Sequence, residues 1–387
     1  MTGIANCTDL LRQMVAIPSD SGHEAAFAAF LEQFLREELE MRTELHHIEG
    51  GSCNVTGHWE TGLPARRRLI LGGHIDTVPP AAHWKTDPYQ LTQQGDELHG
   101  LGAADMKGGL AAQLLVLKRL KEDRETLDVE FAFAGLADEE RYSVGAHAYV
   151  EWTKNCRPPV QDTVFLMGEP HFDNIVIGAA GKVLLSLHIQ GRKGHAAAPE
   201  SGVNAIECMA ALLEAIRAKY GPRYQNGLCG SFCCLKIESI YPGYSLTIPE
   251  SCSCLLNKQL LPTEDVHEFC RDIERLYQEQ VGAGLLSIRR EIPSYPAYQL
   301  EPSQKYVANL TAFLREQFHR EPELRINQSV SDGNILYNSL NIPAILFGPH
   351  GAAFHTEGEY VQKSSLARYM EELYGYICQE YRRDRHV

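Results

Sequence analysis

The sequence lacks an apolar run of the roughly 20 residues that a membrane-spanning helix needs. Its opening stretch, MTGIANCTDLLRQMVAIPSD, has neither a basic start nor a long apolar core, so we expect no signal peptide. Basic residues are scarce as well, because 36 Lys and Arg stand against 50 Asp and Glu, for a net charge of −14. An acidic chain repels phosphate backbones, so we expect no nucleic-acid partner. The lack of a long apolar run leads us to expect no membrane partner.

Cysteine spacing lacks the regular framework of a disulfide-rich protein. The chain has 11 cysteines, an odd number, which favours free thiols in a reducing compartment and a cytoplasmic location. The pairs Cys233-Cys234 and Cys252-x-Cys254 would suit a soft metal ion. Both lie in apolar, strand-like runs, and we interpret them as packing residues.

The chain does have enough apolar residues for a large core. Hydrophobic residues make up 44% and charged residues 22%, which excludes wholesale disorder. Short, continuous apolar runs, typical of buried parallel strands, alternate with segments of helical spacing. The runs are 68–73, 129–136, 163–168 and 343–348, and the helical segments are 22–40, 106–121, 303–319 and 363–381. This order predicts an α/β domain with a mostly parallel sheet and helices on both faces.

The stretch between about 180 and 296 has a different pattern. Residues 182–190 alternate apolar and polar positions, and a helix over 204–219 follows, with Asn204 as its N-cap. The remaining expected elements are strands at 231–240 and 250–260, a helix at 263–280 and a strand at 285–292. This β-α-β-β-α-β order predicts a ferredoxin-like α+β domain at 180–296, inserted into a larger domain formed by 1–179 and 297–387.

Potential metal ligands follow the apolar runs of the larger domain. In open α/β sheets ligands bind beyond the carboxyl ends of the strands, and the groups found there are His74, Asp105, Glu139-Glu140, Glu169 and His355. Each alone has an ordinary interpretation, such as a helix cap or a solvated helix start. Together they would repel one another without a cation. Imidazole and carboxylate ligands suit Zn²⁺, with Co²⁺ or Mn²⁺ as substitutes, and five ligands suit two metals that share a carboxylate.

Six motifs in this chain resemble those of the two-zinc amidohydrolases and exopeptidases. That family includes acetylornithine deacetylase, succinyl-diaminopimelate desuccinylase, aminoacylase and carboxypeptidase G. The motifs are GGHIDTVPP (72–80), GLGAADMKGG (100–109), ADEERYSVGA (137–146), GEP (168–170), GRKGHAAAP (191–199) and FGPHGAAFHTEGEYV (347–361). The resemblance implies a catalytic metal-binding domain with an inserted lid and dimerisation domain, in agreement with the layout above.

The resemblance also implies a ligand set for two Zn²⁺ ions. Asp105 would bridge the two metals. His74 and Glu169 would complete one site, and Glu140 and His355 would complete the other.

Four further roles follow from the same resemblance. Glu139 would be the general base, and Asp76 would hydrogen-bond the imidazole of His74 and fix its tautomer. The Asp105-Met106 peptide bond would be cis. His195, in the inserted domain, would stabilise the oxyanion in the active site of a partner subunit, which requires a homodimer formed through that domain.

Two departures from the family pattern concern the substrate. Leu101 stands where many relatives have Arg, and Lys258 is the nearest candidate for a basic residue that grips a substrate carboxylate; its alternative interpretation is a solvated strand residue. Asn334, with Ser331 and Asp332, lies in a loop that resembles the family's substrate loop.

The predicted function is hydrolysis of an amide bond in an N-acyl amino acid, as in the deacetylases and desuccinylases. A dipeptidase or carboxypeptidase of the same family is the alternative, and a non-catalytic metal-binding regulatory protein is the alternative from another class. A dinucleotide-binding loop is disfavoured because Asp105 occupies the position of its third glycine, and no G-x-S-x-G motif supports a serine hydrolase.

Overall fold

The computed structural model describes residues 2–59, 66–84, 86–156, 160–171, 174–225, 227–240 and 245–383. The chain divides into two units, and each is described by itself. Unit 1 consists of Met1–Gly178, Leu300–Arg325 and Ser331–Val387; unit 2 consists of Ala179–Gln299 and Ile326–Val330. Among the described residues, no helix is long and apolar enough to cross a membrane.

The centre of unit 1 is a sheet whose middle strands are parallel. Its strand order is β1-β2-β6-β3-β7-β17-β8, and β6, β3, β7 and β17 pair in parallel. The strands are β1 (Arg42–His47), β2 (Cys53–His58), β3 (Arg67–His74), β6 (Glu130–Leu136), β7 (Asp162–Met167), β8 (Asn174–Ala179) and β17 (Ala344–Leu346). Nearly every residue of β3, β6 and β7 is buried, as expected for strands covered on both faces.

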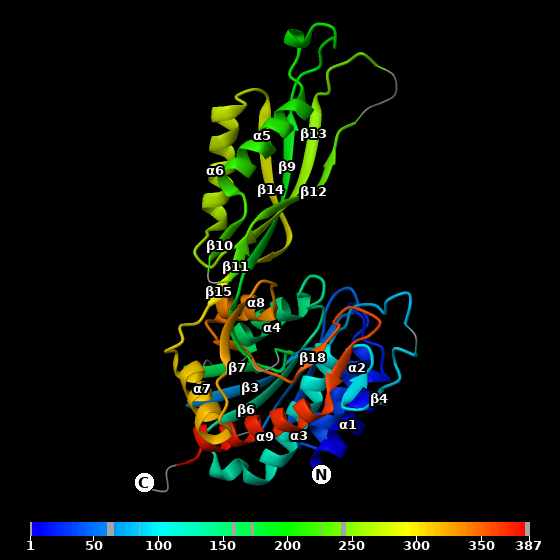
Figure 1. The fold of residues 1–387 in the computed structure, drawn as a ribbon, viewed down its shortest axis with the longest axis vertical. Coiled ribbons are helices and arrows are strands. Elements are labelled where there is room, and N and C mark those ends of the chain that lie inside the picture. Colours follow the sequence, from blue (N-terminus) through cyan, green and yellow to red (C-terminus); the bar gives the residue numbers. More distant parts are fainter. Residues whose placement is uncertain are drawn as a thin grey trace. The chain divides into compact units, whose positions relative to one another are not determined.

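Helices cover both faces of this sheet (Figure 1). On one face α1, α3 and α9 pack together, and on the other α4 packs against α8. The helices of unit 1 are α1 (Thr2–Val15), α2 (Ala25–Glu37), α3 (Gly108–Asp123), α4 (Val144–Cys156), α7 (Lys305–Phe318), α8 (Asp332–Leu340) and α9 (Lys363–Glu380), with a short turn η2 (Arg124–Thr126). The predicted α/β fold class is confirmed.

A second, small sheet of unit 1 supports the loops at the carboxyl end of the large one. Its order is β18-β19-β5-β4, all antiparallel. The strands are β4 (Thr92–Gln94), β5 (Glu97–His99), β18 (Gly351–Ala352) and β19 (Tyr360–Gln362). The turn between β18 and β19 carries His355, and β5 leads into the π-helical turn η1 (Ala103–Lys107), which carries Asp105.

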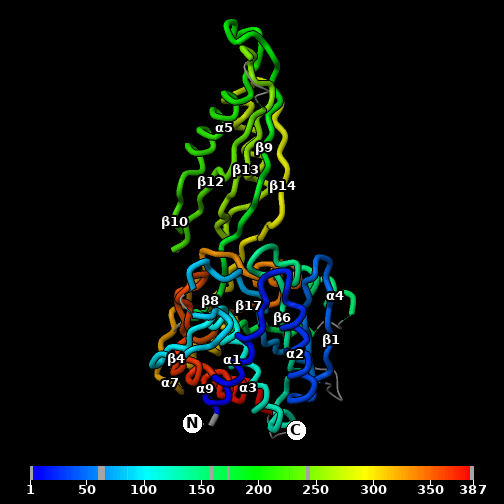
Figure 2. Tube along the Cα trace, turned by 90° about the vertical axis from the view of Figure 1, so that its right-hand side faces the viewer, coloured from blue at the N-terminus to red at the C-terminus, as the bar shows by residue number. Residues whose placement is uncertain are grey.

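Unit 2 has the expected β-α-β-β-α-β order. Its sheet runs β12-β13-β9-β14, with every pair antiparallel, and Figure 2 shows these strands side by side. The elements are β9 (Gly181–Gln190), η3 (Pro199–Ser201), α5 (Ala205–Tyr220), β12 (Phe232–Glu238), β13 (Ser251–Leu260), α6 (Val266–Gln280) and β14 (Leu285–Tyr295). The alternating residues Val183, Leu185, Leu187 and Ile189 of β9 are buried in one core with residues of α5 and α6.

The local structure of unit 2 agrees only in part with the elements expected from the sequence. The Asn204 side chain accepts hydrogen bonds from the N–H groups of Ile206 and Glu207, so the predicted N-cap of α5 is confirmed. The hairpin of β10 (Arg223–Gln225) and β11 (Leu228–Gly230) was not expected, because each strand has only three residues. Two further strands, β15 (Tyr298–Gln299) and β16 (Glu323–Asn327), lie near the points where the chain passes between the units.

Candidate metal centre

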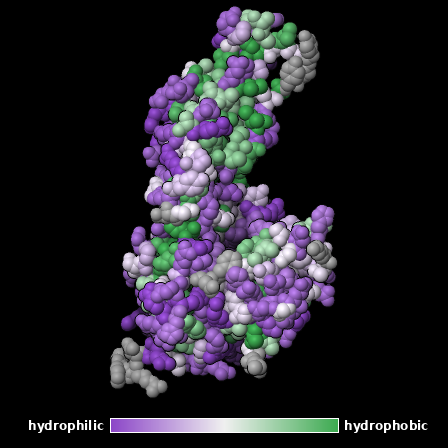
Figure 3. All heavy atoms as spheres, viewed as in Figure 1, coloured by the Kyte–Doolittle hydropathy of each residue, from purple (hydrophilic) through white to green (hydrophobic). Residues whose placement is uncertain are grey.

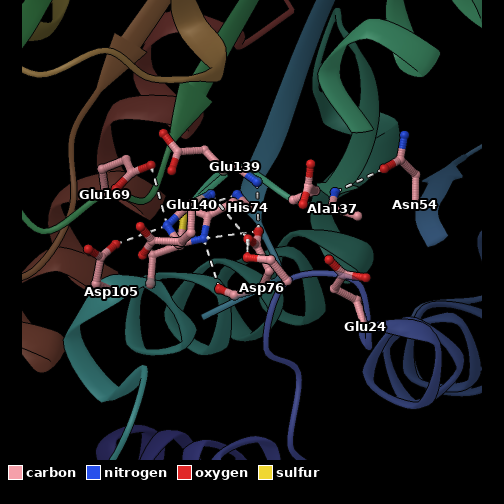
Figure 4. A network of polar contacts seen from close by, with 12 residues as sticks. Glu24, Asn54, His74, Asp76, Asp105, Ala137, Glu139, Glu140 and Glu169 are labelled. Atoms are coloured by element: carbon pink, nitrogen blue, oxygen red, sulfur yellow. Dashed lines mark hydrogen bonds and ion pairs between the residues drawn. The ribbon is translucent and has the colours of Figure 1, made fainter. Parts of the chain in front are cut away.

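The potential ligands of unit 1 come from separate elements that end at the same edge of the large sheet. His74 is the last residue of β3, Glu140 lies in the turn after β6, and Glu169 follows β7. Asp105 comes from η1 and His355 from the turn between β18 and β19. Figure 4 shows the side chains of His74, Asp105, Glu140 and Glu169 converging on one region. This is the edge at which parallel strands present their ligands.

One group of potential ligands consists of His74, Asp105 and Glu169. The Nε2 atom of His74 lies 2.9 Å from Oδ1 of Asp105 and 3.8 Å from Oε1 of Glu169. The ligand atoms of these three residues all lie within 4.8 Å of one another, close enough to share one metal ion.

A second group of three shares Asp105 with the first. The Nε2 atom of His355 lies 3.0 Å from Oε1 of Glu140 and 3.6 Å from Oδ2 of Asp105. The two carboxylate oxygens of Asp105 therefore face different histidines. This is the arrangement that a carboxylate bridging two metals requires.

The electrostatics of these groups fit a cation. The pKa of Glu169 is raised to about 8, mainly by burial; His74 opposes this rise, and the carboxylates of Asp105 and Glu140 contribute to it. The carboxylates of Asp105 and Glu140 raise the pKa of His355 to about 10. Burial raises the pKa of Asp105, but the facing imidazoles outweigh burial and lower it. Positive charge is thus favoured at this edge, and the donor set of imidazoles and carboxylates suits Zn²⁺, Co²⁺ or Mn²⁺.

Glu139, the candidate base, lies beside these ligands. It forms a group of potential ligands with His74 and Glu140, again within 4.8 Å. Burial raises the pKa of Glu139 well above its usual range; His74 lowers it, and the carboxylates of Asp332 and Glu169 raise it further. A carboxylate whose pKa is raised holds a proton more readily than an ordinary one, as a general base requires.

Asp76 holds the turn that carries Glu139 and Glu140. Its carboxylate accepts the N–H of Glu139 at 3.0 Å and the N–H of Glu140 at 3.1 Å, together with the hydroxyl of Ser21 at 2.7 Å. The Nδ1 atom of His74 lies 3.0 Å from the backbone carbonyl oxygen of Asp76 and 3.6 Å from its carboxylate. Asp76 thus faces the imidazole of His74 with both its carbonyl and its carboxylate, and the carboxylate also holds the turn of Glu139 and Glu140.

The loop of Asp105 has the local geometry that the resemblance implied. The Asp105-Met106 peptide bond is cis, so this expectation is confirmed. Gly109, in the first turn of α3, packs against the backbone of Gly168, and an added Cβ would lie 1.8 Å from the Gly168 carbonyl oxygen. A glycine at position 109 thus lets the loop of Asp105 approach the strand end that precedes Glu169.

Glu359 is a residue of this region that the sequence alone does not single out. This side chain is 1% exposed, and its carboxylate accepts hydrogen bonds, each of 3.0 Å, from the N–H groups of Gly102, Ala104 and Asp105. Burial raises the pKa of Glu359 to about 7, although these hydrogen bonds lower it. Its only sequence signal is an acidic residue four positions after His355, and a single acidic residue in a loop is too common to be read alone.

The remaining predicted residues do not join the ligand cluster. Asn334 is fully buried, and its amide oxygen accepts the N–H of Ser331 in the capping box of α8. Lys258 belongs to unit 2, where its side chain is 1% exposed and its ammonium group donates to Glu264 at 2.6 Å. The solvated alternative for Lys258 is wrong, since β13 directs this side chain into a buried ion pair, while its contact with a substrate carboxylate stays a prediction.

His195 also belongs to unit 2 and is exposed. Its backbone N–H donates to the Ser201 hydroxyl at 3.1 Å, and its Nδ1 atom accepts the N–H of Ala197 at 3.1 Å. Because Nδ1 is the acceptor, a neutral imidazole carries its proton on Nε2.

Comparison with known proteins gives a family match over most of the chain. Residues 70–379 match the profile of peptidase family M20/M25/M40. The acetylornithine deacetylase of Erwinia tasmaniensis is 29% identical over 315 residues, which cover 77% of this chain and 79% of that protein.

Solved structures resemble this fold along nearly its whole length. Aminopeptidase PepT from Bacillus cereus aligns with a TM-score of 0.76 at 19% identity, covering 97% of this chain and 98% of the other. A Bacillus subtilis protein described as a dinuclear metal-binding peptidase of the M20 family aligns with a TM-score of 0.74 at 12% identity, covering 98% and 99%. At these identities the likeness shows the fold alone.

Proposed function

Because the chain belongs to peptidase family M20/M25/M40 and is a metal-dependent hydrolase, we propose that it cleaves the amide bond of an N-acyl amino acid with two bound zinc ions. The observation that carries the proposal is the pair of ligand groups that share Asp105. His74, Asp105 and Glu169 would hold one ion, and Asp105, Glu140 and His355 the other. Co²⁺ or Mn²⁺ would suit the same donors. Such ions, when bound, acidify water and polarise a carbonyl.

The protein's own groups would then move the proton. Glu139 accepts a proton from the attacking water and later donates it to the leaving amine, as general acid–base catalysis requires. Asp76 keeps Glu139 in place through the backbone of the turn. Burial of Glu139 supports this role, since it raises the pKa of the carboxylate and so favours uptake of a proton.

Two kinds of substrate are compatible with this chemistry. The identity to the acetylornithine deacetylase of Erwinia tasmaniensis favours an N-acyl amino acid. A dipeptide or the end of a short peptide is the second candidate, and the match to a peptidase family supports it. Both substrates present an amide bond next to a carboxylate or an amine.

We also propose a homodimer formed through unit 2, in which His195 serves the partner's site. The outer strands β12 and β14 each pair on one side among the described strands, and both expose large apolar residues. On the face seen in Figure 3, hydrophobic residues gather on the side of unit 2 where β12 and β13 lie. Exposed apolar strand edges favour pairing with a second copy. The exposed Nε2–H of His195 would supply an oxyanion donor, and a cytoplasmic location would suit such an enzyme.

An activity screen tests the proposed function. The protein is assayed with zinc, cobalt or manganese against N-acetyl amino acids, N-succinyl amino acids and dipeptides, with Glu139→Gln as the matched inactive control. Metal-dependent release of the amine from N-acyl amino acids, absent in Glu139→Gln, is the expected result. Cleavage of dipeptides alone would favour the peptidase, and no turnover of any class by the metal-loaded protein would contradict both.

A further inference from the structure

Two cysteines of unit 2 lie closer together than simple packing requires. The Sγ atoms of Cys234, on the outer strand β12, and Cys254, on β13, are 3.3 Å apart. The register pairs Cys234 with Leu256 and Cys254 with Ile237, so the two thiols meet diagonally across the strands. A bulge between Cys234 and Lys236 shifts the register at this point.

The environments of the two thiols differ. Cys254 is 2% exposed, and burial, together with the Cys234 thiol, raises its pKa to about 12. Cys234 is half-buried and lines a hollow of about 340 Å³ together with Arg217, Phe232 and Cys233. Cys234 lines this hollow and the buried Cys254 does not, so a small oxidant would meet Cys234 first.

We propose that Cys234 and Cys254 are a redox-active dithiol that closes to a disulfide within unit 2 when the protein meets a peroxide. The sulfurs would approach from 3.3 Å to about 2.0 Å, which rotation of the side chains about their Cα–Cβ bonds can provide. The inference is independent of the hydrolase site, because it rests only on residues of unit 2.

The chemistry has two balanced steps. Hydrogen peroxide converts the Cys234 thiol to a sulfenic acid and is itself reduced to one water molecule. The sulfur of Cys254 then attacks the sulfur of Cys234, so that the S–S bond forms, the S–O bond breaks, and a second water molecule leaves with the proton of Cys254. The close approach of the sulfurs offsets the low thiolate content of Cys254, because the attack is intramolecular.

Peptide mapping of the full-length protein tests the proposal. After treatment with hydrogen peroxide and without reductant, we expect one linked pair of peptides, joined through Cys234 and Cys254 and lighter by two hydrogen atoms. Dithiothreitol should separate them. The exposed neighbour provides the matched control, since Cys233→Ser should leave the link intact while Cys234→Ser abolishes it.

Trapping of the intermediate gives a second readout. In Cys254→Ser, dimedone should label Cys234 as a persistent sulfenic acid, whereas in the unsubstituted chain the disulfide should compete with labelling. If Cys254→Ser does not fold, peptide mapping of the unsubstituted chain still shows whether the disulfide between Cys234 and Cys254 forms. Oxidation of Cys233 without any link between Cys234 and Cys254, or a link that survives Cys234→Ser, would overturn the proposal.

Discussion

The carboxylate of Glu359 accepts a hydrogen bond of 3.0 Å from the backbone N–H of Asp105, 254 positions earlier in the chain. The same carboxylate accepts the N–H groups of Gly102 and Ala104. A buried acidic side chain from β18–β19 therefore fixes the backbone of the loop that presents the shared ligand. The direction of both Asp105 oxygens depends on this backbone, so Glu359 is a positioning residue for the proposed metal pair.

Replacement of Glu359 should weaken metal binding, because it loosens the loop that presents Asp105. Glu359→Ala leaves three N–H groups without their acceptor. Those of Gly102 and Ala104 are buried, and an unsatisfied buried group costs about 1–3 kcal/mol before the loop relaxes. We expect metal affinity to fall by about 10–100-fold, as for other groups that orient a ligand. Competition with a fluorescent chelator measures this affinity.

Glu357 provides a matched control for this variant, because it lies in the same turn and is exposed. Glu357→Ala should bind metal as the unsubstituted protein does. Glu359→Gln, which keeps one acceptor oxygen, should recover part of the affinity. Equal affinities for Glu359→Ala and Glu357→Ala would show that the loop does not need Glu359.

Removal of the proposed base should separate catalysis from metal binding. Glu139→Gln retains the size of the side chain but cannot accept the proton from water. We expect kcat to fall by at least about 10²–10⁴-fold, the usual contribution of a general base, while the protein still binds its metals. Steady-state kinetics beside metal analysis measures both, and Glu151→Gln, an exposed glutamate on α4, serves as the control. Near-normal turnover of Glu139→Gln would remove Glu139 from the mechanism.

Substitution of His195 tests the role of unit 2. His195→Ala should lower kcat by about 10²–10³-fold with unchanged metal content, as expected for loss of one oxyanion donor. If His195 serves the partner's site, a mixture of His195→Ala and Glu139→Gln chains should regain activity, because mixed dimers contain one complete site. Failure of the mixture to exceed either variant alone, in a protein shown to be dimeric and to exchange subunits, contradicts action across the dimer.

The ligand pKa values predict opposite effects of pH on the metal-free and metal-loaded protein. The pKa of His355 is raised to about 10 and that of Glu169 to about 8, so the metal-free folded chain holds protons that the unfolded chain releases near pH 6.5 and 4.5. Its stability should therefore fall as pH rises from about 5 toward 9. Metal binding needs both groups deprotonated, so affinity should rise over the same interval.

Thermal unfolding with chelator and with zinc, followed across this pH interval, checks this prediction. The gap between the two melting temperatures should widen as pH rises, and calorimetry in buffers of different ionisation enthalpy should detect proton release on metal binding. A constant gap, or no proton release, would contradict the assigned ligands.

Much of the fold could be predicted because burial leaves a local signal. Continuous apolar runs identified β3, β6, β7 and β17, and alternation identified β9. The ligands followed from the same reasoning, since the carboxyl ends of parallel strands meet at one edge. The short strands of the β10–β11 hairpin carry too few residues for any period to show.

Other features depend on tertiary contacts that sequence does not encode locally. The burial of Lys258 is decided by its partner Glu264 and by the rings of Tyr220 and Phe269 that surround it. The buried amide oxygen of Asn334 accepts the N–H of Ser331 in the capping box of α8. Glu359 acquires its importance only when β19 brings it beneath the loop of Asp105. In each case the sequence shows the type of the residue, but only the folded structure shows which residue it contacts.

The most direct test of the central claim is anomalous diffraction from zinc-loaded crystals of the unsubstituted protein. We predict two anomalous peaks about 3.5–4 Å apart, one beside His74 and Glu169 and the other beside Glu140 and His355, with the Asp105 carboxylate between them. A single peak, or peaks away from Asp105, would contradict the account.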